Sequence, residues 1–450
     1  MADPETTSRT PLAYGIDERP PGWWETALYG WQHTLVDISP FVLPLAIATA
    51  AGLSATDTAR LISFGLLGMG LATLIQTTVG NRLPIVQGPS ATLMGTLGPV
   101  AAQLGFGAVW GAALVGGIVE GLVGVTGLVG RARRWFPPAV TGAVVLIIGL
   151  SLGELAVRLA VGSGTALEIG LAGAVLVLVL TMRRTLGSVW GGLPARAAIF
   201  VSIWAIGLGA GGVFGVVDWE LVAASAWFAP PALFPFGGPG FGWSFPVAAI
   251  LAALAGYAGS MVESIGDYAA TCEAARVEYG VGHMNRGIAA EGFACALSAT
   301  LGALPSTSYT QNIGIISATG VASRTVVRIA GLIFVAYGLC PKFGALLVAI
   351  PRSVLGGVFL LVCWMIAVSG ARLVRRAPRT GANRVVVAAS LGFGLGVPAL
   401  LRFGPGRAVA EWLPDPVALV LTNPIVLGVV LAVSLNALIG GGEPVRRHSA

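Results

Sequence analysis

The sequence has few charged residues and almost no lysine. Only 10% of its 450 residues are charged, Lys342 is the one lysine, and 55% of the chain is hydrophobic. With a mean hydropathy of +0.84, this composition excludes a water-soluble fold with an ordinary polar shell. It predicts an all-α polytopic membrane protein of the cell inner (plasma) membrane.

The chain also lacks the signals of several other classes. Residues 1–21 hold no apolar stretch of the length that a secretory signal requires. The four cysteines all fall in apolar segments, so no disulfide framework is expected. No nucleophile and base pair, metal-ligand spacing, Walker motif or Rossmann fingerprint is present. An enzyme, a metal site, a cofactor and ATP-driven transport are therefore not predicted.

Fourteen segments are apolar enough to cross a bilayer, which takes about 20 residues. Counted from a cytoplasmic amino terminus, they leave most arginines in loops on the side of both tails, as the positive-inside bias requires. This bias, rather than binding of nucleic acid, accounts for the net charge of +6. The predicted spans lie near 34–52, 58–79, 83–104, 107–129, 136–158, 165–182, 197–217, 244–270, 286–302, 304–322, 326–348, 352–372, 384–402 and 421–440.

Two pairs of motifs recur seven spans apart. Residues 136–144 (FPPAVTGAV) open the fifth span and residues 350–358 (IPRSVLGGV) the twelfth, with Pro, Val, Gly and Val in one register. Leu83-Pro84 opens the third span and Leu304-Pro305 the tenth. Partners seven spans apart run in opposite directions, so the pattern predicts two inverted seven-span repeats.

The third and tenth spans are expected to begin with short extended stretches. Two prolines and a glycine between Leu83 and Ser90 disfavour a helix, which should start near Ser90. Ser, Thr and Tyr after Leu304 favour the same structure, and Asn312 is a candidate cap for the helix that follows. Non-helical backbone inside a membrane must be buried in protein or line a cavity, so the two breaks predict a polar site where they meet.

Ionisable side chains within apolar spans point to the same place. Glu263 and Asp267 lie four residues apart on one face of the eighth span, Glu291 lies in the ninth, and His33 begins the first. A carboxylate at the bilayer centre costs about 2.5–3.5 kcal/mol on insertion scales. Each of these residues also has a purely structural interpretation. Glu263 and Asp267 could hold neighbouring helices together, Glu291 could cap or bond to the tenth span, and His33 could be a buried histidine that orients other residues. By burial in a span alone, Asp37, Glu120 and Glu154 rank with Glu263.

With these residues together, the chain resembles the nucleobase/ascorbate transporter family, the nucleobase:cation symporters type 2. The resemblance rests on Glu263-Ser-Ile-Gly-Asp267, on Gln311-Asn-Ile-Gly-Ile-Ile-Ser-Ala-Thr-Gly320 and on Gln32-His33. It implies a homodimer whose core domain moves past a gate domain as an elevator. The domains implied are a cytoplasmic tail at 1–25, core parts at 26–130 and 244–350, gate parts at 131–243 and 351–440, and a cytoplasmic tail at 441–450.

The resemblance also implies roles for particular residues. Glu263 and Gln311 would hydrogen-bond the base, and Asn312 would shape its pocket, with backbone groups of Ser90, Ala91 and Thr92 facing the other side of the base. Asp267, Glu291 and His33 would support the site and proton coupling, with His33 also close to the substrate. The family usually has Asp where Glu291 stands and an Asn-x-Thr-Thr-like stretch where Ser306-Thr307-Ser308 stands, which leaves substrate and coupling open.

The predicted function is import of a nucleobase by proton symport. The adjacent N–H and C=O groups of a lactam match a carboxylate and a carboxamide. The resemblance favours a purine such as xanthine or uric acid over uracil, because Gln311 and Asp267 look more like the xanthine and urate members of the family than the uracil members. Sodium is not excluded as the coupling ion. The alternatives are an anion exchanger of the sulfate-transporter type, a channel and a membrane-embedded enzyme.

Overall fold

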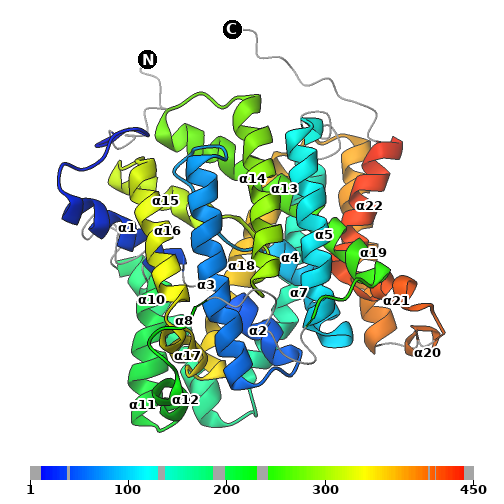
Figure 1. Cartoon of the computed structure of the whole chain (residues 1–450). Coiled ribbons are helices and arrows are strands. Elements are labelled where there is room, and N and C mark those ends of the chain that lie inside the picture. The colour runs from blue at the N-terminus through cyan, green and yellow to red at the C-terminus, as the bar shows by residue number, and fades with distance from the viewer. Residues whose placement is uncertain are drawn as a thin grey trace.

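The computed structural model describes residues 12–37, 41–129, 137–185, 198–230, 242–403, 406–410 and 412–439, and most of these are helical (Figure 1). All of the predicted C-terminal tail, 441–450, and residues 1–11 of the predicted N-terminal tail lie outside them. Among the described residues, eight helical segments are long and apolar enough to cross a membrane, or up to nine if one bent pair counts as a span. The chain is therefore a multi-pass helical membrane protein.

Seven of these segments are single helices. They are α3 (Ala55–Thr78), α5 (Phe106–Val125), α7 (Pro138–Val161), α8 (Ala166–Thr185), α13 (Val247–Ala275), α18 (Arg352–Arg376) and α19 (Gly381–Phe403). The bent pair is α16 (Arg324–Gly338) with α17 (Pro341–Val348), at 82°. The eighth segment, Trp23–Ala50, contains α1 (Trp23–Asp37) and α2 (Val42–Ala50). Further helices are α10 (Ala198–Ser202), the π-helix η4 (Ile203–Ala210), α11 (Gly211–Val213), α12 (Trp219–Ala224), α14 (Val281–Thr300), α20 (Arg407–Ala410), α21 (Asp415–Thr422) and α22 (Pro424–Ile439).

The first membrane segment starts earlier than its apolar pattern predicts. The helix α1 (Trp23–Asp37) begins at Trp23 rather than near residue 34, and α2 (Val42–Ala50) follows it. A Cβ on Gly30 would come within 2.9 Å of the Ile329 side chain, so α1 packs closely on α16. This tertiary contact stabilises a stretch whose polar residues hide it from a hydropathy count.

Two segments that begin with non-helical backbone meet in the interior. The strand β1 (Gln87–Pro89) precedes α4 (Ala91–Leu104), and β2 (Ser306–Ser308) precedes α15 (Thr310–Thr319). The strands pair antiparallel, with Gln87 opposite Ser308 and Pro89 opposite Ser306. Both strands are buried, so each one satisfies the backbone of the other where no water is available.

The caps of the two helices differ. The Ser90 hydroxyl accepts a hydrogen bond from the Leu93 backbone N–H at 3.2 Å and caps α4. The helix α15 instead has Tyr309 at its N-cap position, without a side-chain cap bond. The prediction that Asn312 caps this helix is therefore wrong, because α15 begins at Thr310 and Asn312 is already inside its first turn.

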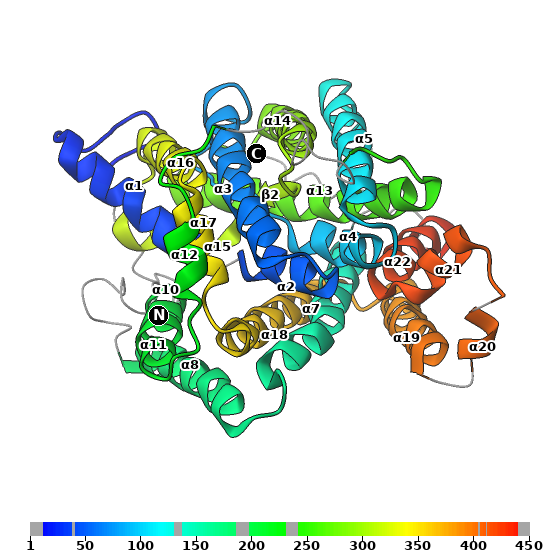
Figure 2. The ribbon, with the colours of Figure 1, turned by 60° about the horizontal axis from the view of Figure 1, so that its bottom comes forward.

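The helices pack most extensively within two groups. The first group contains α1–α5 and α13–α17, with the pairs α5–α14 and α3–α16. The second contains α7, α8, α10, η4, α11 and α18–α22, with the pair α7–α18, and the short helix α12 packs on α17. Figure 2 shows α3, α13 and α14 along one side and α7, α8 and α18 along the other. Small residues bring paired backbones together: a Cβ on Gly117 would lie 2.7 Å from the Gly292 carbonyl oxygen.

Candidate functional site

A cavity of about 630 Å³ lies between the two groups of helices, beside β2. The first group lines it with Glu263, Gln311, Ala91 and residues 307–310. The second group lines it with Val145, Arg183 and the C-terminal half of α18, including Trp364 and Arg372. This volume lies in the range of small-molecule pockets.

Glu263 is placed on this cavity by the close approach of α4 and α13. A Cβ on Gly259, one turn earlier on α13, would lie 2.7 Å from the Thr92 methyl carbon, so the two helices nearly touch. The Thr92 hydroxyl donates a hydrogen bond to Glu263 Oε2 at 3.1 Å. No described residue donates to the second carboxylate oxygen, which is therefore available to a ligand in the cavity.

Gln311 lies on the same cavity from the first turn of α15. Its side chain is exposed and has no hydrogen bond to any described residue. The amide therefore offers one acceptor and two donors beside the carboxylate of Glu263. A planar ligand with adjacent N–H and C=O groups finds complementary partners there.

Asp267 and Glu291 hold the wall of the cavity from behind and do not line it. Asp267 accepts hydrogen bonds from Ser308 Oγ at 2.9 Å and Thr310 Oγ1 at 2.7 Å. Glu291, fully buried, accepts hydrogen bonds from Ser264 Oγ at 2.6 and 2.8 Å, Tyr268 at 2.8 Å and Thr307 Oγ1 at 3.2 Å. Both carboxyl groups therefore fix β2 and the start of α15 against α13.

His33 and Asn312 meet on the other side of α15. The Asn312 amide nitrogen donates to His33 Nδ1 and, at 3.2 Å, to Asp37 Oδ2. The Asn312 amide oxygen accepts from the Val86 backbone N–H at 3.3 Å. All three side chains are buried. Asn312 thus connects α1, through His33 and Asp37, to the backbone just before β1.

The comparisons with known proteins agree with this architecture. Residues 24–403 match the model of Xan_ur_permease, described as a permease family. The chain belongs to this family of nucleobase permeases. The permease is 32% identical to the uric acid permease PucK of Bacillus subtilis, over 93% of this chain and 96% of PucK. It is 31% identical to the xanthine permease XanQ of Escherichia coli K12, over 96% of this chain and 94% of XanQ.

Solved structures of other transporters share the fold. The murine anion transporter Slc26a9, in its inward-facing state, aligns with a TM-score of 0.64 at 11% identity, over 94% of the permease and 69% of that chain. The transmembrane domain of the cyanobacterial bicarbonate transporter BicA aligns with a TM-score of 0.57 at 14% identity, over 94% of the permease and 99% of that chain. At this identity the likeness concerns the fold alone.

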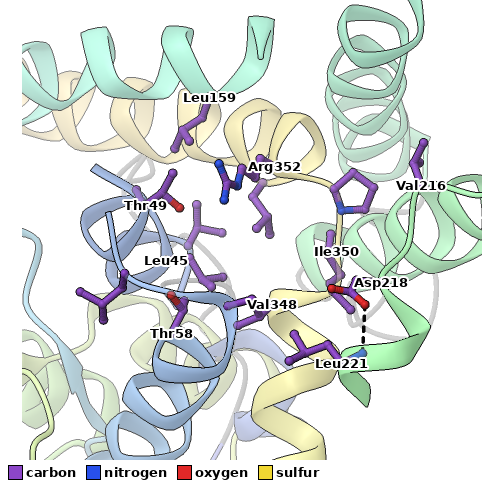
Figure 3. Close-up of a pocket in the computed structure, with 17 residues that line it drawn as sticks. Leu45, Thr49, Thr58, Leu159, Val216, Asp218, Leu221, Val348, Ile350 and Arg352 are labelled. Carbon is purple, nitrogen blue, oxygen red and sulfur yellow. Dashed lines mark hydrogen bonds between the residues drawn. The ribbon is translucent and has the colours of Figure 1, made fainter. Parts of the chain in front are cut away.

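A second cavity of about 250 Å³ lies in the permease at the opposite end of α18 (Figure 3). Leu45, Thr49, Thr58 and Leu159 line it beside Arg352, and Asp218 lies at its other edge, where its carboxylate accepts the Leu221 N–H at 2.9 Å. None of the predicted site residues lines this cavity. Its walls are mostly aliphatic, and the polar groups that would orient a small planar ligand are in the first cavity instead.

The structure of the permease thus divides the predicted site residues into two sets. Glu263, Gln311 and Ala91 line the cavity. Ser90, Thr92, Asn312, His33, Asp267 and Glu291 do not line it and lie behind its wall. The sequence analysis did not single out Tyr309, which lines the cavity and donates to the Pro89 carbonyl at 3.2 Å, and it gave no role to Asp37. Asp37 carried a usable signal, since an acid in an apolar span is what singled out Glu263.

Proposed function

We propose that this permease is a secondary transporter of nucleobases, with Glu263 and Gln311 as the pair that binds the base. The observation that carries the proposal is the unused oxygen of Glu263 in a cavity that also holds the free amide of Gln311. The carboxylate accepts from ring N–H groups, and the carboxamide donates to a ring carbonyl and accepts from a neighbouring N–H. A base without one of these groups would leave a buried partner unpaired, at about 1–3 kcal/mol.

Oxopurines such as xanthine and uric acid are the preferred substrates in this proposal, with uracil as a weaker one. Both oxopurines carry adjacent lactam groups that match the pair at Glu263 and Gln311. The names of PucK and XanQ, a uric acid permease and a xanthine permease, support the same class. In this proposal the backbone at Ala91 faces the base from the side opposite Gln311, Ser90 and Thr92 support it from behind the wall, and Asn312 and His33 hold the pocket in shape.

The proposal for energy coupling is proton symport, with Glu263 taking the proton. A carboxylate that is partly removed from water binds a proton readily, and a neutral carboxyl group crosses the bilayer interior at lower cost. Asp267 and Glu291 support the site, and sodium is the alternative coupling ion.

The proposed movement is an elevator. The first group of helices acts as the core domain (26–130 and 244–350) and the second as the gate domain (131–243 and 351–440), in a fourteen-span chain of two inverted repeats with both termini cytoplasmic. The cavity lies along the C-terminal half of α18, near Arg372, which the positive-inside bias assigns to the cytoplasmic side. The structure then corresponds to an inward-facing state. A homodimer would anchor the gate domains while the cores move.

An anion exchanger is the second candidate, because the solved structures that share the fold include anion transporters. Arg183 and Arg372 on the second group's wall of the cavity also favour an anion. The carboxylate of Glu263 opposes it, since an anion beside this group meets repulsion in a medium of low dielectric constant. Nucleobase symport accounts for Glu263, and anion exchange does not.

Uptake measurements distinguish the two candidates. Cells that express the permease are given radiolabelled xanthine, uric acid, uracil, adenine or sulfate, with and without a protonophore. Proton symport of an oxopurine gives uptake of xanthine or uric acid that the protonophore abolishes. Uptake of sulfate without uptake of any base would contradict the proposal and support the exchanger.

A further inference from the structure

Asp37 is a buried acid for which the proposed function has no role. It ends the described part of α1, its side chain is fully buried, and one oxygen, Oδ2, accepts the amide of Asn312. The other oxygen, Oδ1, finds no hydrogen-bond partner among the described residues. Buried polar atoms in proteins nearly always have a partner, so this carboxyl oxygen is an unused acceptor in a buried setting.

No cation near Asp37 balances a carboxylate there. On its own helix, His33 accepts the Asn312 amide at Nδ1, which assigns its proton to Nε2 and leaves the ring neutral. From the side of α15, the titratable neighbour is the Tyr309 phenol, which lies within electrostatic range of both Asp37 and Glu263. A negative charge at this position is therefore uncompensated by the described residues.

The other helices that pack on α1 supply no counter-charge either. On α16 the basic residues lie in the first two turns and are engaged elsewhere: Arg324 pairs with Asp17, and Arg328 donates to the Thr77 carbonyl at 2.8 Å. The described helix α10 has no titratable residue. An acid in this setting is stable in a membrane only if a cation joins it, and the smallest cation is the proton.

The position of Asp37 connects it to the cavity. Its neighbour Val36 and, beyond it, Leu43 line the cavity wall, so the buried carboxyl group is one residue along the chain from the cavity. Asn312 joins Asp37 directly to the residue after Gln311. Protonation of Asp37 removes the charge that attracts the Asn312 amide, and this weakens the constraint on the first turn of α15, where Gln311 stands.

From this geometry we propose that Asp37 is a second proton-binding residue of the transport cycle, distinct from the base-binding carboxylate of Glu263. A proton from water in the cavity forms an O–H bond at Oδ1, crosses with the base and returns to water on the other side. The inference depends on the proposed function, because it assumes that a base is transported. It predicts about two protons per base, one on each carboxyl group.

The test uses the purified full-length protein in liposomes with a trapped pH-sensitive dye and radiolabelled xanthine or uric acid. Asp37→Asn, which imitates a permanently protonated acid, should keep base-for-base exchange within about twofold and lower the proton-to-base ratio by one. Since one pH unit corresponds to a factor of about ten per coupled proton, accumulation should fall about tenfold across a gradient of one unit. The matched control is Asp57→Asn, the same chemical change at a half-buried acid in the first turn of α3, which lines neither cavity.

The outcomes separate the two proposals. If the wild-type protein moves no base, the proposed function fails. If it moves base and Asp37→Asn shows the wild-type proton ratio, the inference about Asp37 is wrong and the proposed function stands. The inference about Asp37 would also be overturned if Asp37→Asn lost exchange and the wild-type protein moved only one proton per base, because Asp37 would then have a structural role.

Discussion

The Thr92 hydroxyl donates to Glu263 Oε2 at 3.1 Å and joins the first turn of α4 to α13. The bond connects the two halves of the chain at the wall of the cavity. It occupies one carboxylate oxygen and thereby orients the other, so the direction in which Glu263 meets a ligand is fixed before the ligand arrives.

Glu263→Gln should abolish uptake of the transported base. The amide keeps the size of the side chain but replaces an acceptor with a donor that faces the ring N–H, and it cannot carry a proton. Uptake and surface expression are measured in the same cells. The control Glu154→Gln changes an exposed acid that pairs with Arg158 at 2.7 Å and should transport normally. Normal transport by Glu263→Ala at full surface expression would contradict the assignment.

Thr92→Val should weaken binding without abolishing transport. The substitution removes the hydroxyl that orients Glu263 and preserves the shape of the side chain, and the loss of one hydrogen bond is worth about 1 kcal/mol, or about fivefold in KM. Thr92→Ser keeps the hydroxyl and should remain close to the wild-type protein. Equal KM values for the Val and Ser variants would mean that this bond does not position the carboxylate.

Gln311→Glu should alter which bases compete with the labelled substrate. The change replaces the amide donor with an acceptor. A ring carbonyl that faced the amide now meets repulsion, and a base that presents an N–H group at that position is favoured. The measurement is inhibition of uptake by unlabelled xanthine, uric acid, uracil and adenine. An unchanged order of inhibition would place Gln311 outside the binding site.

Ser264→Ala should destabilise the protein by about 1–3 kcal/mol, since it removes donor contacts to both oxygens of the fully buried Glu291. Thermal unfolding of the purified protein in detergent reports the change. The matched control is Ser390→Ala, because Ser390 is equally buried but its hydroxyl has no partner among the described residues. If both variants lose the same stability, the contacts to Glu291 contribute nothing specific.

Some of this architecture follows from sequence alone. The hydrophobic composition predicts a helical multi-pass membrane protein, and the structure and family confirm that class. The prolines around Pro84 and Pro305 mark the segments where β1 and β2 are found, since proline disfavours helix at those points. The start of α1 at Trp23 does not follow from hydropathy, because its packing on α16 decides it.

The side-chain partners were harder to predict than the segments. Asparagine is a residue type that often caps helices, but the partners of Asn312, His33 and Asp37, come from a helix near the other end of the sequence. Asp37 and Glu263 give the same local signal, an acid in an apolar segment. Only the fold shows that Glu263 faces the cavity while Asp37 lies behind its wall.

The antiparallel pairing of β1 with β2 also constrains how the protein is made. During synthesis β1 leaves the ribosome long before Ser306, so its backbone N–H and C=O groups enter the membrane without their final partners. The nascent first half must shelter them with water, lipid headgroups or the insertion machinery until the second half arrives. Neither half expressed alone contains a complete binding site, whereas two separately expressed halves that meet in the membrane would restore it.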